Sequence, residues 1–270
     1  MSRPWPARWP ALVLGLLIIA ALAAPLLARS APDEVDLAAR RLAPSIGHWL
    51  GTDDLGRDLF ARTLYGARVS LAVGLLAAVV STLLGGLVGG IAGISAPWLD
   101  RLLMRCTDAV LIVPRLPLLM LLGAAFMPGV AVLILLVGAV GWMETARVVR
   151  AELRSIIGRE YVSAAQATGV RRGRLLWRHL APVVWPTLAV AASLAVGRSM
   201  LLESALSFFG VGVQPPQASW GNMLYQAQNA LTTTPWLAIG PGVMIFLTVL
   251  AVNALGEGLS RGDRSTTRRP

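Results

Sequence analysis

Charged residues inside apolar stretches are the first places where this sequence could act chemically on a solute. Arg115 lies between Pro114 and Pro117, and Arg198 and Glu203 share a later apolar stretch. The five-residue spacing of Arg198 and Glu203 separates them by about 140° on a helix, which does not favour a pair within that helix. We expect each side chain to face a bundle interior, a cavity or a neighbouring chain. Each could line a pathway or, equally, belong to a structural or interfacial pair.

The composition excludes several kinds of reaction centre. All 24 basic residues are arginine, so the chain lacks the lysine of a Walker A phosphate loop or a Schiff-base enzyme. Cys106 is the only cysteine, and His48 and His179 are far apart in the chain, so neither a disulfide within the chain nor a zinc-type cluster is predicted. We predict no catalytic residue, cofactor or metal site. If the protein uses ATP and Mg²⁺, partner subunits must bind them.

The elements that hold these residues are predicted to be membrane-spanning helices. Hydrophobic residues make up 56% of the chain, charged residues 14%, and the mean hydropathy is +0.66. These values indicate an all-α, polytopic membrane protein. A span needs about 20 mainly apolar residues. Six stretches are predicted to cross: 11–28, 69–96, 107–127, 130–145, 183–210 and 236–255.

The distribution of arginine predicts the orientation. With both termini in the cytoplasm, the inner segments contain sixteen arginines, whereas the outer loop 29–68 contains six that are balanced by six acidic residues. This bias follows the positive-inside rule. The net charge of +10 therefore fits cytoplasmic loops better than a nucleic-acid partner.

The chain is predicted to have three regions. Residues 1–66 hold a cytoplasmic tail, the first span and an outer loop, residues 67–257 hold the main five-helix domain, and residues 258–270 form a cytoplasmic tail. The first span could instead be a signal peptide cleaved after residues 21–23. Its 18-residue apolar run is longer than the usual 7–15 residues of a signal sequence, which favours a retained helix.

Three local patterns predict packing outside the charged positions. Gly85, Gly89 and Gly93 form a row of small residues that allows close helix packing, within the chain or, less favoured, at a subunit interface. In the outer loop, Thr52 or Asp53 could cap a helix beginning at Asp54, lying on the membrane surface or packed on the bundle. Residues 210–235 are too rich in glycine and proline for one helix and are expected to fold over the outer mouth.

The largest inner segment, 147–182, is the candidate for contact with a partner. It contains eight arginines. One face of a short helix is formed by residues at i, i+3, i+4 and i+7, namely Tyr161, Ala164, Ala165 and Thr168. Gly169 can end this helix, and the following arginines, Arg171, Arg172 and Arg174, would complement its C-terminus. Pro182 suits the first turn of the fifth span. A solvated basic loop would show the same charge pattern.

Three motifs together resemble one family. Residues 163–165, followed by Gly169 and Pro182, resemble the EAA loop of permease subunits of binding-protein-dependent ABC importers, with Ser163 in place of the glutamate. Residues 50–58 (LGTDDLGRD) resemble a signature of the dipeptide/oligopeptide/nickel branch, and residues 202–216 (LESALSFFGVGVQPP) resemble its fifth-span exit. The motifs occur in the family's order, and the chain is similar to the second, shorter permease of such an importer.

The resemblance implies a type I importer (MetI-like) fold and a set of partners. The chain would pair with a homologous permease, two ATPase subunits would dock beneath, and an extracytoplasmic substrate-binding protein would deliver the solute. The segment around 160–169 would be the coupling helix in an ATPase groove. Ser163 cannot supply the glutamate's charge, so this contact would depend on shape or on the three arginines that follow. The location implied is the bacterial inner membrane, with lipid around the chain.

The resemblance leaves the transported solute open. Di- and oligopeptides are the first expectation, and nickel or another chelated metal is the alternative. A rival of another class is a secondary transporter driven by an ion gradient, with Glu203 and Asp108 as carriers. Such a protein usually has an inverted repeat, and none is visible in this sequence. A second rival is a membrane scaffold that transports nothing.

Overall fold

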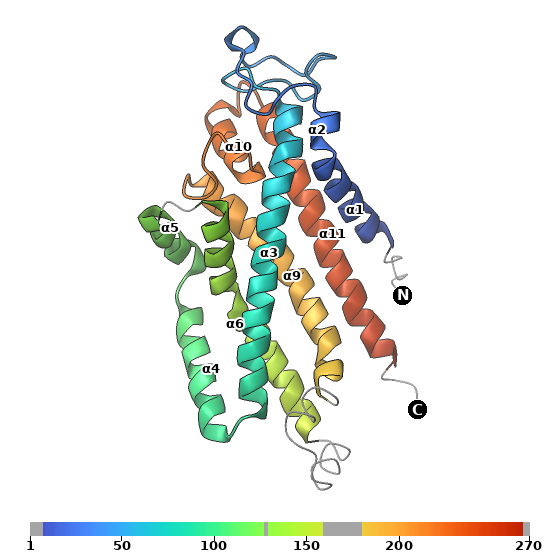
Figure 1. Cartoon of the computed structure of the whole chain (residues 1–270), viewed down its shortest axis with the longest axis vertical. Coiled ribbons are helices and arrows are strands. Elements are labelled where there is room, and N and C mark those ends of the chain that lie inside the picture. The colour runs from blue at the N-terminus through green and yellow to red at the C-terminus, as the bar shows by residue number, and fades with distance from the viewer. Residues whose placement is uncertain (1–7, 127–128, 159–179, 267–270) are drawn as a thin grey trace.

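The chain folds into a bundle of long helices (Figure 1). The structure is a computed structural model that describes residues 8–126, 129–158 and 180–266, the last six of these as backbone only. Within these residues, every regular element is a helix, and a single isolated bridge joins Thr52 and Asp58. The prediction of an all-α protein is confirmed.

Four helices run along the length of the molecule and are long and apolar enough to cross a membrane. They are α3 (Leu59–Ile94), α6 (Val130–Ile157), α9 (Ala181–Phe208) and α11 (Trp236–Thr266), the last apolar over Trp236–Ser260. Helix α3 packs against α6 and α9, and α11 packs against α9 and α1 (Arg8–Leu22), as Figure 1 shows. These helices correspond to the predicted second, fourth, fifth and sixth spans.

The predicted third span corresponds to a bent pair of helices rather than to one continuous helix. Helices α4 (Pro97–Ile112) and α5 (Arg115–Phe126) meet at an angle of 80°. Proline disfavours helical geometry in the residue before it, and Val113 is extended, with ψ of 123°. Pro114 also lacks the N–H that would continue the helix. The pair counts as at most one broken span.

The first predicted span corresponds to a shorter apolar helix. Helix α1 has 15 residues, about 22 Å at 1.5 Å per residue, against a hydrocarbon core of about 30 Å. After Ala23, helix α2 (Ala24–Leu27) extends the same segment. Four long helices, one broken pair and this shorter helix are consistent with six crossings, which stay a prediction.

The glycine row of α3 is used for packing within the chain, as expected. A Cβ atom on Gly85 would lie 2.6 Å from Thr145 Cβ, and one on Gly93 would lie 2.8 Å from Leu153 Cβ. At Gly89 it would overlap the carbonyl oxygen of Ala146. The three glycines therefore bring the backbone of α3 against α6, which only residues without a side chain allow.

One end of the bundle carries the loop 28–58 and helix α10 (Trp220–Ala227), together with the short helices η1 (Leu37–Ala39) and η3 (Gln228–Ala230) (Figure 1). Residues 210–235 do not form one helix, as predicted. Helix α10 begins after Ser219, which exchanges hydrogen bonds with Asn222.

The prediction of a helix that begins at Asp54 is wrong, because the helix that follows this loop is α3 and it begins at Leu59. Asp58, rather than Thr52 or Asp53, is the N-cap, and its carboxylate accepts the N–H of Ala61. Gly51 and Gly56 have positive φ angles of +80° and +74°. Asp53 accepts the N–H groups of Leu55 and Arg57. Residues 51–58 therefore close into a tight loop instead of a helical turn.

Candidate functional site

Two of the predicted intramembrane residues meet at a third that the sequence reasoning missed. Arg115, at the start of α5, donates a hydrogen bond from Nη2 to Glu144 Oε1 on α6, at 2.7 Å. Arg198 on α9 forms an ion pair with the other carboxylate oxygen, Oε2. The exposed fractions of the side chains of Arg115, Glu144 and Arg198 are 22%, 37% and 40%. One carboxylate thus joins two arginines from two other helices.

The sequence could have named Glu144 as one candidate partner, though not as the one that pairs. It is the only acidic residue in the predicted fourth span, and a charge at membrane depth is usually paired with another. Two arginines in other spans require a nearby carboxylate, and the only other one within the predicted spans besides Asp108 is Glu203. The sequence does not say which helices are neighbours, so the choice between these acids depended on the fold.

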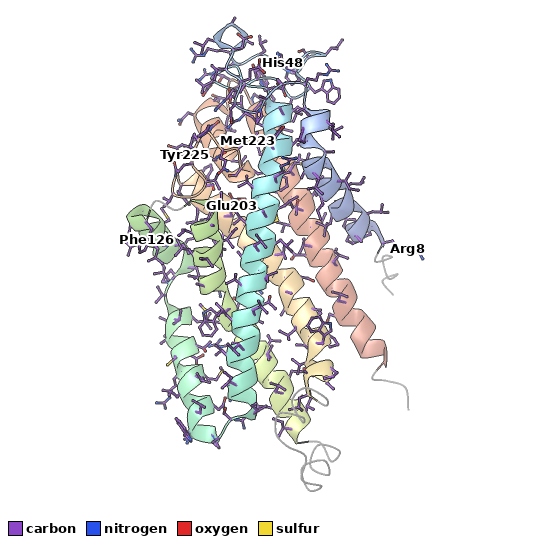
Figure 2. The ribbon with its side chains drawn as sticks, in the orientation of Figure 1. Arg8, His48, Phe126, Glu203, Met223 and Tyr225 are labelled. Carbon is purple, nitrogen blue, oxygen red and sulfur yellow. The ribbon has the colours of Figure 1, made fainter. Side chains whose placement is uncertain are left out.

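Glu203 faces the interior of the bundle and does not pair with Arg198, as its spacing predicts. It is completely buried on α9, towards the end of the molecule that carries α10 (Figure 2). Its Oε2 accepts a hydrogen bond from Ser70 Oγ of α3 at 3.1 Å, and its Oε1 accepts one from Ser207 Oγ at 2.9 Å.

The two serines connect the Glu203 carboxylate to the backbone at Val213 and Trp220. Ser70 Oγ accepts the N–H of Trp220 at 3.1 Å, and Ser207 Oγ accepts the N–H of Val213 at 3.0 Å. Each serine hydroxyl thus accepts one hydrogen bond from a backbone N–H and donates one to the carboxylate. Glu203 therefore links α3, α9 and α10, and the arrangement is that of a satisfied structural carboxylate.

A series of ion pairs joins α4 to the second half of α6. Arg147 pairs with Asp108, and both are about half exposed. Further along, Asp100 accepts a hydrogen bond from Arg150 Nη2 at 2.7 Å and lies 3.0 Å from Arg154 Nη2. Asp108 is therefore already paired. Helix α4, which is too polar to contact lipid on all sides, is held against α6 by charge.

The predicted coupling residues lie outside the described part of the chain, except for Pro182. Tyr161, Ser163, Ala164, Ala165, Thr168, Gly169, Arg171, Arg172 and Arg174 all fall between residues 159 and 179. Helix α9 begins at Ala181, so Pro182 is in its first turn as predicted. The helices that flank the segment pack together through an apolar cluster, formed by Val149, Leu153, Ile156, Leu180 and Val184.

Among the side chains that the structure describes, no three His, Cys, Asp or Glu residues gather in a way that could hold a metal ion. The charged groups instead form ion pairs between helices, and one cluster, formed by Arg115, Glu144 and Arg198, stays partly exposed within the bundle.

Known proteins resemble this chain over most of its length. Residues 85–262 match the family described as binding-protein-dependent transport system inner membrane component. A protein of Brucella suis biovar 1 (strain 1330), named as a peptide permease, is 40% identical over 245 residues, covering 90% of this chain and 81% of the relative. The oligopeptide transport system permease protein OppC of Bacillus subtilis (strain 168) is 36% identical over 248 residues, or 92% of this chain and 81% of the relative. The dipeptide transport system permease protein DppC of Alkalihalophilus pseudofirmus is 36% identical over 252 residues, or 92% and 83%.

Proposed function

The chain belongs to the family of binding-protein-dependent transport system inner membrane components, and on this premise we propose that it is a permease subunit of an ATP-driven peptide importer. The similarity over nine-tenths of the chain to proteins named as peptide, oligopeptide and dipeptide permeases carries this proposal. The same names favour peptides over nickel or another chelated metal. The chain contributes half of the translocation path, and a homologous permease contributes the other half.

The energy for transport comes from other chains. A protein without lysine cannot build a Walker A loop, and the family is a transport component rather than an enzyme. Two ATPase subunits bind ATP and Mg²⁺ and dock on the permease pair. An extracytoplasmic substrate-binding protein delivers the peptide from the opposite side of the inner membrane.

The direct test is uptake by the purified complex in proteoliposomes. With the binding protein outside, we expect labelled trialanine to accumulate when ATP is enclosed and to stay outside when a non-hydrolysable analogue is enclosed. An ion-gradient-driven transporter would respond to a proton or sodium gradient and ignore the nucleotide. Uptake that follows the gradient without ATP would contradict the proposal, and no uptake by a complete complex would favour a scaffold.

We propose that the segment 159–179 couples the chain to an ATPase. The packing of α6 against the start of α9 supports this role, because Leu153, Ile156 and Leu180 fix the two ends of the segment side by side. A force on the segment would therefore move both helices together. The alanine face, with Ala164 and Ala165, enters a groove on the ATPase, and the arginines after Gly169 contact its rim.

Substitutions in this segment test the coupling. We expect Ala164→Arg or Gly169→Asp to lower uptake at least tenfold, because a charge placed in a buried contact costs about 1.4 kcal/mol or more. Membrane insertion should be unchanged. Gly158→Asp is the matched control, since a Cβ at Gly158 would have open space around it. Normal ATP-dependent uptake by both Ala164→Arg and Gly169→Asp would refute the docking of this face.

We also propose that both termini are cytoplasmic and that the first helix is retained. The arginines of α6 support this orientation, because Arg150 and Arg154 lie near the C-terminal end of that helix, which points away from α10 (Figure 1). Contacts of α1 support its retention. Arg68 donates hydrogen bonds to the carbonyl oxygens of Ala21 and Leu22, at 2.6 and 2.8 Å.

A further inference from the structure

The cluster formed by Arg115, Glu144 and Arg198 has an excess of positive charge. Each oxygen of the Glu144 carboxylate faces one arginine, so two cations share a single anion. No other carboxylate lies within ion-pair distance of either arginine among the residues from 8 to 260 whose side chains are described. Each guanidinium has five N–H donors, and Glu144 can accept only some of them. Donors and a net positive charge are therefore available to a further anion.

The cluster lies deep in the bundle yet is partly exposed. Glu144 has about 20 Å of α6 on either side, and Arg198 is at least about 15 Å from either end of α9, at 1.5 Å per residue. Between 22% and 40% of each side chain is exposed on the surface of this chain. Charged groups at such depth face water or other protein rather than lipid tails. The surface that carries the cluster therefore faces the translocation path or a partner chain.

The break between α4 and α5 adds to the positive field. Helix α5 begins at Arg115, so one arginine of the cluster is the first residue of a helix, where backbone N–H groups have no partner within the helix. The N-terminal end of a helix carries a partial positive charge and favours anions. Pro114 is the cause of this arrangement, because it ends α4 and lets a new helix begin at membrane depth.

We propose that the cluster formed by Arg115, Glu144 and Arg198 binds the terminal carboxylate of a peptide during its passage. This inference rests on the proposed function as a peptide permease. Guanidinium groups recognise carboxylates through paired, charge-assisted hydrogen bonds. Glu144 holds the two arginines in position and reduces their net charge. It thereby keeps the binding weak enough for release, as a site within a transport path requires.

The test compares a peptide with and without its carboxylate. The complete importer, in proteoliposomes with ATP enclosed, is given trialanine or trialanine amide at concentrations that saturate the binding protein, as measured separately on that protein. We expect Arg198→Gln to lower uptake of trialanine about tenfold, the effect of losing one charge-assisted contact. Uptake of the amide should be the same in the variant and the wild type. Arg198→Lys should restore part of the trialanine uptake.

The control and the contrary outcomes separate the alternatives. Arg147→Gln removes an arginine from a nearby exposed pair with Asp108 and should change uptake by no more than about twofold. Equal losses for trialanine and its amide in Arg198→Gln would overturn the inference and indicate a structural role. Loss of the second permease on purification of Arg198→Gln would also overturn it, and would indicate a subunit contact. Failure of the wild type to import either peptide would refute the proposed function instead.

Discussion

At the scale of single residues, partners and exposure distinguish two glutamates within the helical bundle. Glu203 is surrounded by hydroxyl donors and has no exposed surface. Glu144 pairs with arginines and keeps 37% of its side chain exposed. A buried carboxylate that has hydrogen-bond donors around it stabilises the fold, whereas a partly exposed cluster with an excess of positive charge can contact a solute. We therefore infer a structural role for Glu203 and keep solute contact as a proposal for the cluster around Glu144.

Substitution of Glu203 tests this assignment. Glu203→Ala leaves Ser70 and Ser207 without their acceptor and opens a cavity, which should lower the free energy of unfolding by about 2–4 kcal/mol. Glu203→Gln should cost about 1 kcal/mol, because its amide group brings a donor to a site where a serine already donates. Both are measured by thermal unfolding in detergent. Glu152→Ala, at a half-buried position of α6, is the control, and equal melting of Glu203→Ala and wild type would contradict the assignment.

At the scale of helices, the contact between α3 and α6 depends on glycines that leave no room for a side chain. Gly89 packs directly on the backbone of Ala146, which cannot move without shifting α6. The next residue, Gly90, has nothing within 4 Å of the position where its Cβ would be. Two adjacent glycines of the same helix therefore have opposite surroundings.

Alanine substitutions of these two glycines give a matched pair. We expect Gly89→Ala to destabilise the protein by about 1–3 kcal/mol, because the added methyl group overlaps the Ala146 backbone. Gly90→Ala should leave stability unchanged or slightly higher, since alanine favours the helix. Yield and thermal unfolding in detergent measure both. If Gly90→Ala proved the more harmful variant, the packing of α3 against α6 would have to be revised.

At the scale of the whole molecule, the two ends of the bundle are built differently. The end with α10 is closed by hydrogen bonds between distant segments, such as Arg57 Nη2 to Gln226 Oε1 at 3.2 Å and Trp220 Nε1 to the Thr63 carbonyl at 3.0 Å. The opposite end is held by ion pairs between α4 and α6 and by the apolar cluster around Leu153. In the orientation that we propose, the closed end would receive the solute from the binding protein and the end with the ion pairs would face the ATPases.

A cysteine-labelling experiment tests the orientation. Cys106 is the only cysteine, so Cys106→Ser gives a cysteine-free background in one step. In that background we expect Ser45→Cys, in the exposed outer loop, to react with a membrane-impermeant maleimide in intact cells. Ser155→Cys, exposed near the end of α6, should react only in inverted vesicles. The reverse pattern would refute cytoplasmic termini.

The sequence by itself determined the all-helical membrane fold, the presence of the four long helices and the family motifs. Hydropathy and helix length are properties of contiguous residues, so they can be read without knowing which helices are neighbours. The same holds for Pro182, whose place in the first turn of α9 follows from proline's missing N–H.

Only the tertiary structure decided which charges meet and where α3 begins. The pairing of Arg115 and Arg198 with Glu144 depends on the packing of α5, α6 and α9, whose residues are far apart in the chain. The start of α3 at Leu59 depends on the loop before it, which Asp53 and two glycines close. Helix-capping patterns in the sequence do not show whether this loop or an earlier helical turn forms. Contacts between distant segments have no local signal, because each is set by the relative positions of whole helices.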